Sequence, residues 1–290
     1  MFKLFGKKRA EEPKPESKAE PEKNPELAAF GAQFLPEEIT ILAVTGADGF
    51  GGGRESEDAL WQASIGLTAW MEEDDDGPAV RRPARLVALA DDKLLAFQRQ
   101  RVTRDRILRA KVRRAKEDDR FLLVDIPEPA MEPELKAILE EQKKPVTVRD
   151  PELGEFALDR SAGWFAAEAD WLGQSIQLTF DRDEDQSSCF QTARALMDGQ
   201  TDWDERVRAY AARELLEQAN GWAQDGGEND TPQKPVTREQ FMANLEAEAI
   251  QVYGDGRFEF WFHDGGLFWG RAIHVSGDLA GGPAGARMEE

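Results

Sequence analysis

The chain has 290 residues, of which 40% are hydrophobic and 32% are charged, and its formal net charge is −20. This length favours two domains, and the acidic excess argues against nucleic-acid binding and favours basic protein partners. The chain has one cysteine, no apolar run of ~20 residues and no secretory signal, which excludes an internal disulfide and a membrane-spanning helix and leads us to expect a cytoplasmic protein.

Residues 1–35 are dominated by proline, glutamate, lysine and serine. A segment of this composition has too little apolar surface to form a core, so we predict a disordered charged tail. The basic residues Lys7, Lys8 and Arg9 follow two phenylalanines, a patch that suits at most weak contact with an anionic membrane.

Residues 36–127 are predicted to form a small β-rich domain. From Leu108 onward apolar and basic side chains alternate, as in a half-exposed strand. Arg109, Lys111 and Arg113 would share the basic face of this strand, and they are the candidate contacts for an anion such as nucleic acid. Pairing of the same three side chains with acidic residues of this chain, or contact with the neighbouring domain, is the alternative.

A glycine-rich stretch over residues 46–54 follows the first predicted strand. It lacks the Gly-Lys-Ser/Thr ending of a phosphate-binding P-loop and the spacing of a dinucleotide-binding turn. We therefore favour a flexible loop, and an anion-binding loop that uses Arg54 is the alternative.

Residues 128–150 are predicted to be a linker that contains a short amphipathic helix, Glu132–Gln142. The next domain, residues 151–285, is predicted to contain three strands, about three helices and three more strands, and residues 286–290 a tail. One of these helices should begin at Thr237, because "TREQ" is a capping box. The predicted fold class is α+β, with two antiparallel three-strand meanders and the helices packed on their sheet.

The densest aromatic segment is "FEFWFHDGGLFWG", Phe258–Gly270. Its two adjacent glycines predict a two-residue turn between strands over residues 257–263 and 267–275. The residues Phe258, Phe260 and Phe262 would then share one face, which we expect to lie in the core. The alternative is that this hairpin lines a ligand cleft. The candidate residues of that cleft are Glu259, Trp261, His263 and Trp269.

Several chemistries are disfavoured by spacing. In the predicted register His263 and His274 lie ~20 Å apart, which is too far for one metal ion. Residues Asp181–Gln186 begin like a calcium loop but lack its glycine and its final glutamate. Cys189 has no histidine nearby in the sequence, so we expect a buried thiol. We predict no cofactor and no metal, and we assign no catalytic residue.

The second half of the chain resembles a known bacterial family. The resemblance is carried by "LGEFALDRSAGWFAAEADWLGQSIQL", by "DWDERVRAYAARELLEQANGW", and by "FEFWFHDGGLFWG" followed by "VSGDLAGG", and it covers roughly residues 146–285. The family is the bacterial domain of unknown function 2262. The resemblance implies a compact α+β domain and brings no activity and no site residues.

Together these features favour a non-enzymatic module, similar to immunity or inhibitor proteins, that binds a basic protein through an acidic surface. Two alternatives stay open. The first is a small-ligand binder or enzyme with a cleft at the aromatic hairpin, and the second is nucleic-acid contact through the basic strand 104–116. The sequence leaves the oligomeric state open.

Overall fold

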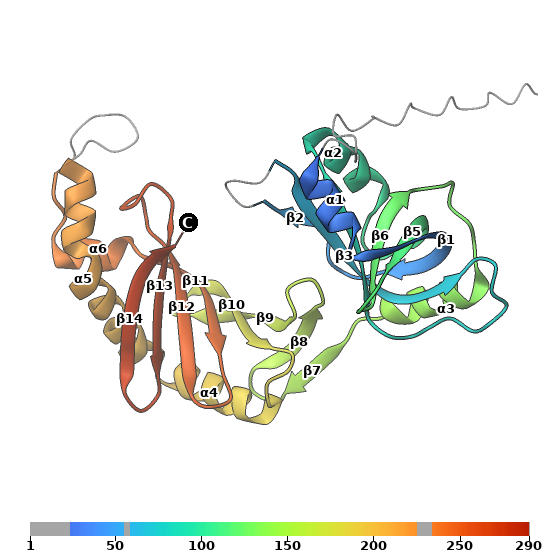
Figure 1. Cartoon of the computed structure of the whole chain (residues 1–290). Helices are drawn as coiled ribbons and strands as arrows, with labels where there is room; N and C mark the ends of the chain where they lie inside the picture. The colour runs from blue at the N-terminus through green and yellow to red at the C-terminus, as the bar shows by residue number, and fades with distance from the viewer. Residues whose placement is uncertain (1–23, 55–58, 225–233, 290) are drawn as a thin grey trace, which may run out of the picture. The chain divides into compact units, whose positions relative to one another are not determined.

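The computed structural model describes residues 24–54, 59–224 and 234–289. The chain divides into two compact units, Met1–Lys144 and Pro145–Glu290. Unit 1 contains a six-stranded sheet and unit 2 an eight-stranded sheet, and each unit also contains helices (Figure 1). This confirms the α+β class in outline. No helix among the described residues is long and apolar enough to cross a membrane.

Five strands of unit 1 close into a barrel. They are β1 (Phe34–Thr45), β3 (Trp61–Glu72), β4 (Ala84–Ala90), β5 (Ile107–Ala115) and β6 (Arg120–Asp125). Around the barrel the order is β1-β5-β6-β4-β3 and back to β1, and every pair is antiparallel except β4 with β6. This order and these directions are those of the OB-fold barrel. The short strand β2 (Gly51–Gly53) pairs with β3 outside the closed ring.

A helix occupies part of the segment predicted to be a disordered tail. Helix α1 (Pro25–Gly31) begins after Asn24, whose side chain accepts a hydrogen bond from the Glu26 N–H, and it has proline in its first turn. Phe30 and Phe34 pack together at its end and are both buried. The prediction was wrong for residues 24–35, because these two rings supply the apolar surface that the composition did not suggest. Residues 1–23 lie outside the described residues.

The predicted helix after β6 belongs to unit 1 and is not part of a linker. Helix α3 (Pro133–Gln142) buries Leu135 and Leu139 in a cluster with Leu42 and Val44 on the outside of the barrel. Helix α2 (Asp92–Arg101) lies between β4 and β5 and contributes apolar side chains to the barrel core. The boundary between the units therefore comes after α3, at Lys144.

Unit 2 is built on an eight-stranded sheet whose strands lie in chain order. They are β7 (Thr147–Asp150), β8 (Gly154–Asp159), β9 (Trp164–Trp171), β10 (Gln174–Asp181), β11 (Glu246–Val252), β12 (Arg257–His263), β13 (Ala272–Asp278) and β14 (Gly282–Glu289). Two four-strand antiparallel meanders meet where β10 and β11 run parallel. The predicted meanders had three strands each, and the predicted tail from residue 286 is the end of β14. The edge strands were missed because β7 is very short and β14 is glycine-rich.

Three helices link β10 to β11, as a parallel pair requires a crossover connection. They are α4 (Gln186–Asp198), α5 (Gln200–Gln224) and α6 (Arg238–Asn244). The predicted capping box is present at the start of α6, where Thr237 and Gln240 exchange hydrogen bonds. Below the helices lies an aromatic core, in which Phe258, Phe260 and Phe262 are fully buried, as predicted.

The turn between β12 and β13 differs from the predicted one. His263 pairs with Ala272, so the connection spans residues 264–271 and not two glycines. The buried carboxylate of Asp264 accepts hydrogen bonds from the N–H groups of Gly266, Phe268 and Gly270. This carboxylate holds a longer loop than the Gly-Gly pair suggested.

The longer loop changes the register of β13. His274 lies opposite Trp261, only two residues from His263 along β12, and not near Arg257 as predicted. The separation of ~20 Å expected from the two-residue turn is therefore wrong. Within the described ranges, no group of three or more His, Cys, Asp or Glu side chains is arranged to hold a metal ion.

Candidate functional site

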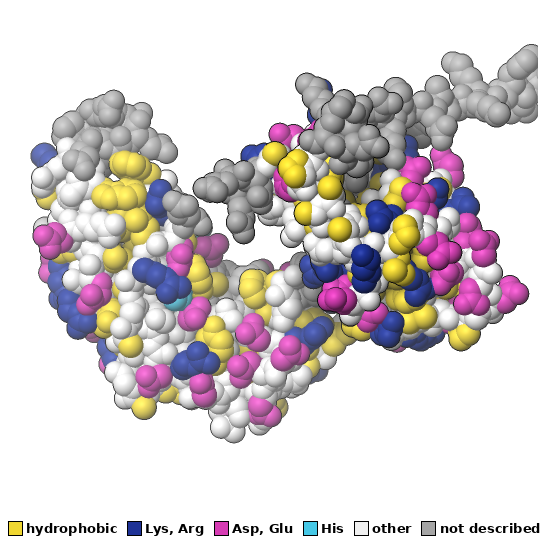
Figure 2. All heavy atoms as spheres, in the orientation of Figure 1, with side chains coloured by type: hydrophobic (Ala, Val, Ile, Leu, Met, Phe, Trp, Pro, Cys, Tyr) yellow, Lys and Arg dark blue, Asp and Glu magenta, His cyan; other side chains and the backbone are white. Residues whose placement is uncertain are grey.

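The face of the unit 2 sheet that points away from the helices carries three of the predicted cleft residues. Along β12 the side chains of Glu259, Trp261 and His263 alternate with the buried phenylalanines, so they lie on the opposite face. His274 pairs with Trp261 and therefore shares that face. Both histidines of the chain therefore lie on this face. The cyan histidine atoms in Figure 2 show its position, and acidic and basic side chains lie around them.

At the centre of the open face four polar or aromatic side chains contact one another. The rings of Trp261 and His274 lie 4.5 Å apart between centroids, and His274 Nε2 is 3.1 Å from Glu259 Oε2. The Tyr253 hydroxyl donates to Glu259 Oε1 over 3.1 Å. Burial, followed by the negative charge of Glu259, raises the pKa of Tyr253 to about 12, so the hydroxyl remains a donor at neutral pH. These contacts give the open face an ordered centre.

An acidic hollow lies beside this centre, where β9, β10, β11 and β12 are adjacent. It encloses about 350 Å³ and is lined by Glu168, Glu246, Glu248 and His263, with four uncharged residues completing the lining. His263 Nε2 lies 3.7 Å from Glu248 Oε2, and the imidazole is 62% exposed. No lysine or arginine belongs to this lining, so the hollow is suited to receive a cationic group from outside.

The fourth predicted cleft residue lies elsewhere. Trp269 is in the loop after β12, and its ring is 4.6 Å from that of Trp222 on α5. It lines a separate cavity of about 100 Å³, together with Val236 and Asn244. The four residues predicted to form one cleft are therefore divided: His263 lines the acidic hollow, Glu259 and Trp261 belong to the adjacent centre, and Trp269 lies at the loop.

The three predicted anion contacts of β5 are engaged within the chain. Arg109 pairs with Glu73 at 2.7 Å, and Lys111 pairs with Glu38 at 2.6 Å. Arg113 donates to backbone carbonyl groups at the end of α1 and the start of β1. The hydrogen bond and the negative charge of Glu38 raise the pKa of Lys111. Arg109 and Lys111 thus show the pairing with acidic residues that the sequence left as an alternative, whereas Arg113 binds backbone carbonyl groups instead.

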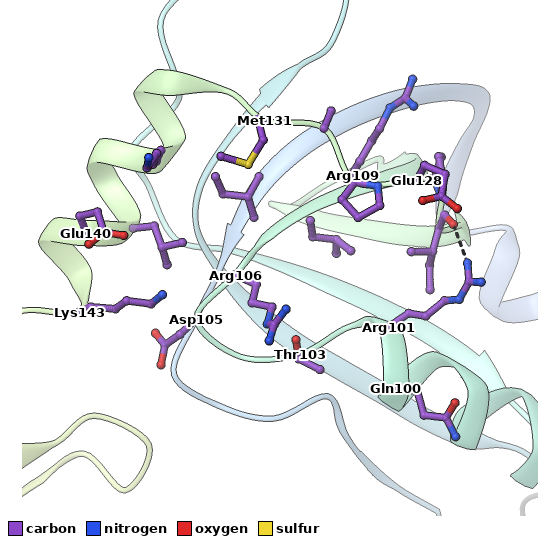
Figure 3. Close-up of a pocket in the computed structure, with 18 residues that line it drawn as sticks. Gln100, Arg101, Thr103, Asp105, Arg106, Arg109, Glu128, Met131, Glu140 and Lys143 are labelled. Carbon is purple, nitrogen blue, oxygen red and sulfur yellow. Dashed lines mark hydrogen bonds between the residues drawn. The ribbon is translucent and has the colours of Figure 1, made fainter. Parts of the chain in front are cut away.

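A second concave site is a groove of about 730 Å³ in unit 1 (Figure 3). Its walls are the end of α2, the start of β5, the segment 126–131 and α3. The charged side chains that line it are Arg101, Arg106, Arg109, Lys136, Lys143, Asp105, Glu128 and Glu140. The sequence did not predict this groove, because the rest of β5 and all of β6 lie between its first two walls and its last two.

Cys189 is buried at the start of α4, and the acidic turn before it supplies the cap of this helix. Burial, with added repulsion from Glu184 and Asp185, raises the pKa of the Cys189 thiol to about 12. Asp185 is the N-cap of α4 and accepts a hydrogen bond of 2.8 Å from the Ser188 N–H, which lowers the pKa of its carboxyl group. The buried thiol agrees with the sequence interpretation.

Two family models match the chain, one in each unit. Residues 150–288 match a family described as "Uncharacterized protein conserved in bacteria (DUF2262)", which confirms the resemblance found in the second half. Residues 26–142 match "Domain of unknown function (DUF7021)". Comparison with curated proteins and with solved structures gave no match.

Proposed function

We propose that this protein is a non-enzymatic binding module that captures a basic protein on the open face of the unit 2 sheet. The observation that carries the proposal is the acidic hollow, which Glu168, Glu246, Glu248 and His263 line together and to which no lysine or arginine contributes. A lysine or arginine side chain of the partner would enter the hollow and form charge-assisted hydrogen bonds with these carboxylates.

The surroundings of the hollow support a protein partner. Trp261 is half-buried on the adjacent strand and presents a large amphipathic side chain, a residue type enriched where interfaces gain most of their binding energy. The formal charge of −20 would accelerate the approach of a basic partner and make association sensitive to salt. The acidic hollow would then supply the local specificity.

The contacts of Tyr253 on the open face support a preformed binding surface. The pKa of Tyr253 is raised to about 12, so its hydroxyl stays protonated at neutral pH and donates to Glu259. Glu259 Oε2 also lies 3.1 Å from His274 Nε2. Side chains held in this way lose less conformational freedom when a partner binds.

Affinity capture followed by a binding measurement tests this proposal. The full chain is immobilised, proteins are captured from a bacterial lysate, and the partner is purified for titration calorimetry at about 50 and about 500 mM salt. The test variant is the triple substitution E168Q/E246Q/E248Q. The control is E37Q/E117Q/E205Q, which removes the same charge at exposed positions outside the hollow.

We expect a basic partner that binds the wild type and the control variant alike and binds the hollow variant at least ~10-fold more weakly. Binding should also weaken at the higher salt concentration. Capture of an acidic partner, or equal affinities for the two triple variants, would overturn the proposal.

A further inference from the structure

The first half of β5 has a strand partner on one side only. β1 pairs with β5 as far as Ile107, whereas β6 pairs with it only between Lys111 and Arg114. After β6 the chain contains Pro127 and Pro129, which cannot donate a ladder hydrogen bond. Within the described residues, the first four residues of β5 therefore form a short open edge in an otherwise closed barrel.

The backbone groups at this edge point toward the groove of unit 1. The Thr45 N–H donates to the carbonyl oxygen of Arg106 over 2.9 Å, so this carbonyl group faces β1. Backbone groups alternate in direction along an antiparallel strand, so those of Ile107 and Arg109 face the other way. Both residues line the groove. An extended peptide lying there would find N–H and C=O groups with which to pair, as in strand addition to a sheet edge.

The side chains of the groove combine apolar surface with positive charge. Ile107, Leu139 and the 75% exposed Met131 supply apolar contacts. Five lysine and arginine residues and three acidic residues line the groove, whereas the whole chain has 37 basic and 57 acidic residues. In Figure 3, Lys143 reaches from the end of α3 toward the loop that carries Arg106. This local reversal of charge favours an occupant with carboxylates.

Arg109 is held from within the chain at the groove. Its Nη2 atom pairs with Glu73, and its Nε atom is buried. An occupant of the groove would therefore reach the backbone of Arg109 more readily than its guanidinium group.

We propose that this groove binds an extended acidic segment of another protein, which adds as a strand to the open edge of β5. The segment would pair its backbone with Ile107 and Arg109, place apolar side chains against Leu139 and Met131, and place carboxylates near Arg106 and Lys143. This site is independent of the acidic hollow of unit 2, and it selects the opposite charge.

A synthetic peptide tests this inference on the full chain. The probe is a fluorescent hexapeptide of alternating glutamate and valine, titrated by fluorescence anisotropy. We expect saturable binding that weakens with salt, and slower hydrogen exchange at the amides of Ile107 and Arg109 on binding. The variant R106E/K143E should bind at least ~10-fold more weakly. The control R81E/K93E makes the same charge change at exposed positions outside the groove and should bind within ~2-fold of the wild type.

Three further probes can contradict the inference. A backbone N-methylated version of the peptide should not bind, because it cannot donate to a strand edge, and equal binding would exclude strand addition. Equal binding of a lysine-valine peptide would exclude selection for acidic segments. Tighter binding of a ten-nucleotide oligothymidylate that protects the same amides would overturn the peptide assignment in favour of nucleic acid.

Discussion

The two units of this protein bury their strands in different ways, and the difference appears in the size of the core side chains. The barrel interior of unit 1 combines six alanines and branched aliphatic residues with the rings of Phe50, Trp70 and Phe121. The core between the unit 2 sheet and its helices contains a larger share of aromatic rings. A five-stranded barrel encloses a narrow space, whereas an open sheet under helices leaves more room for rings. Closure of the sheet therefore favours smaller core side chains without excluding large ones.

The same difference determines where each unit presents a surface for binding. In unit 1, helices α1 and α3 pack against the outside of the barrel. The groove lies beside the first residues of β5, which β6 is too short to pair with. Unit 2 has helices on one face of its sheet, and its acidic hollow lies on the opposite face. Each candidate site therefore lies at strands that lack a neighbour: a strand partner is missing in unit 1, and a layer of helices is missing in unit 2.

The largest effect is expected from removing a ring of the unit 2 core. Phe260 is fully buried, with ring centroids 5.2 Å from Trp171, 5.5 Å from Phe258 and 6.0 Å from Phe262. Phe260→Ala should lower the free energy of unfolding by about 3–5 kcal/mol, because neighbouring rings cannot fill the cavity. Urea unfolding followed by hydrogen-exchange mass spectrometry should show the loss in unit 2 peptides, and equal loss in unit 1 peptides would contradict independent cores.

The next effect concerns the loop that replaced the predicted tight turn. Asp264→Ala would leave the N–H groups of Gly266, Phe268 and Gly270 without their acceptor. We expect a loss of about 2–3 kcal/mol in the free energy of unfolding, measured in urea. Asp278→Ala is the control, since Asp278 accepts similar hydrogen bonds in an exposed turn, and it should cost less than about 1 kcal/mol. Equal losses would show that burial of Asp264 is unimportant.

An enlargement of the barrel core tests the narrow interior. Ala110 is fully buried inside the barrel, so Ala110→Leu should force strands apart and lower the free energy of unfolding by about 1–3 kcal/mol. Ala195→Leu, on an exposed position of α4, should change it by less than about 0.5 kcal/mol. A stabilising effect of Ala110→Leu, measured by thermal unfolding, would indicate spare space in the barrel.

The smallest effect is expected at a buried carboxylate of unit 2 and depends on pH. Burial alone would raise the pKa of Asp150, but hydrogen bonds from the N–H groups of Leu153 and Glu152, and the charge of Arg194, outweigh it and lower the pKa. A lowered pKa contributes stability above the unfolded-state value of about 3.9, and this stability is lost as the pH falls through the lower folded-state value.

Asp150→Asn should therefore lower the free energy of unfolding by about 1 kcal/mol at pH 7, and its difference from the wild type should shrink as the pH falls below the unfolded-state value of about 3.9. Urea unfolding at several pH values measures the difference and its decline. A difference that does not change with pH would show that the charge of the carboxylate contributes nothing to stability.

Local features of the sequence predicted local features of the fold. The capping box at Thr237 marks the start of α6, and the alternation of Phe258, Phe260 and Phe262 marks the buried face of β12. Helix α3 was found from its apolar spacing. Each of these signals is contained within a few residues, so no knowledge of distant segments was needed.

Pairing between distant segments was less accessible. The register of β13 depends on a loop held by the buried Asp264, and a pair of glycines suggested a shorter turn. The acidic hollow combines Glu168 with Glu246 and His263, from three strands that meet only because β10 lies beside β11. The groove of unit 1 likewise combines β5 with α3. The spacing of residues along the chain carries no information about contacts between such distant segments.

The sequence alone determined the mixed α and β character, the aromatic inner face of the second unit and the resemblance of its second half to a bacterial family. Only the tertiary structure decided that five strands close into a barrel, that two four-strand meanders join through a parallel pair, and which charged side chains lie together. The reason is physical: side-chain periodicity and caps act over one or two turns of backbone, whereas strand partners and register are chosen by contacts across the whole unit.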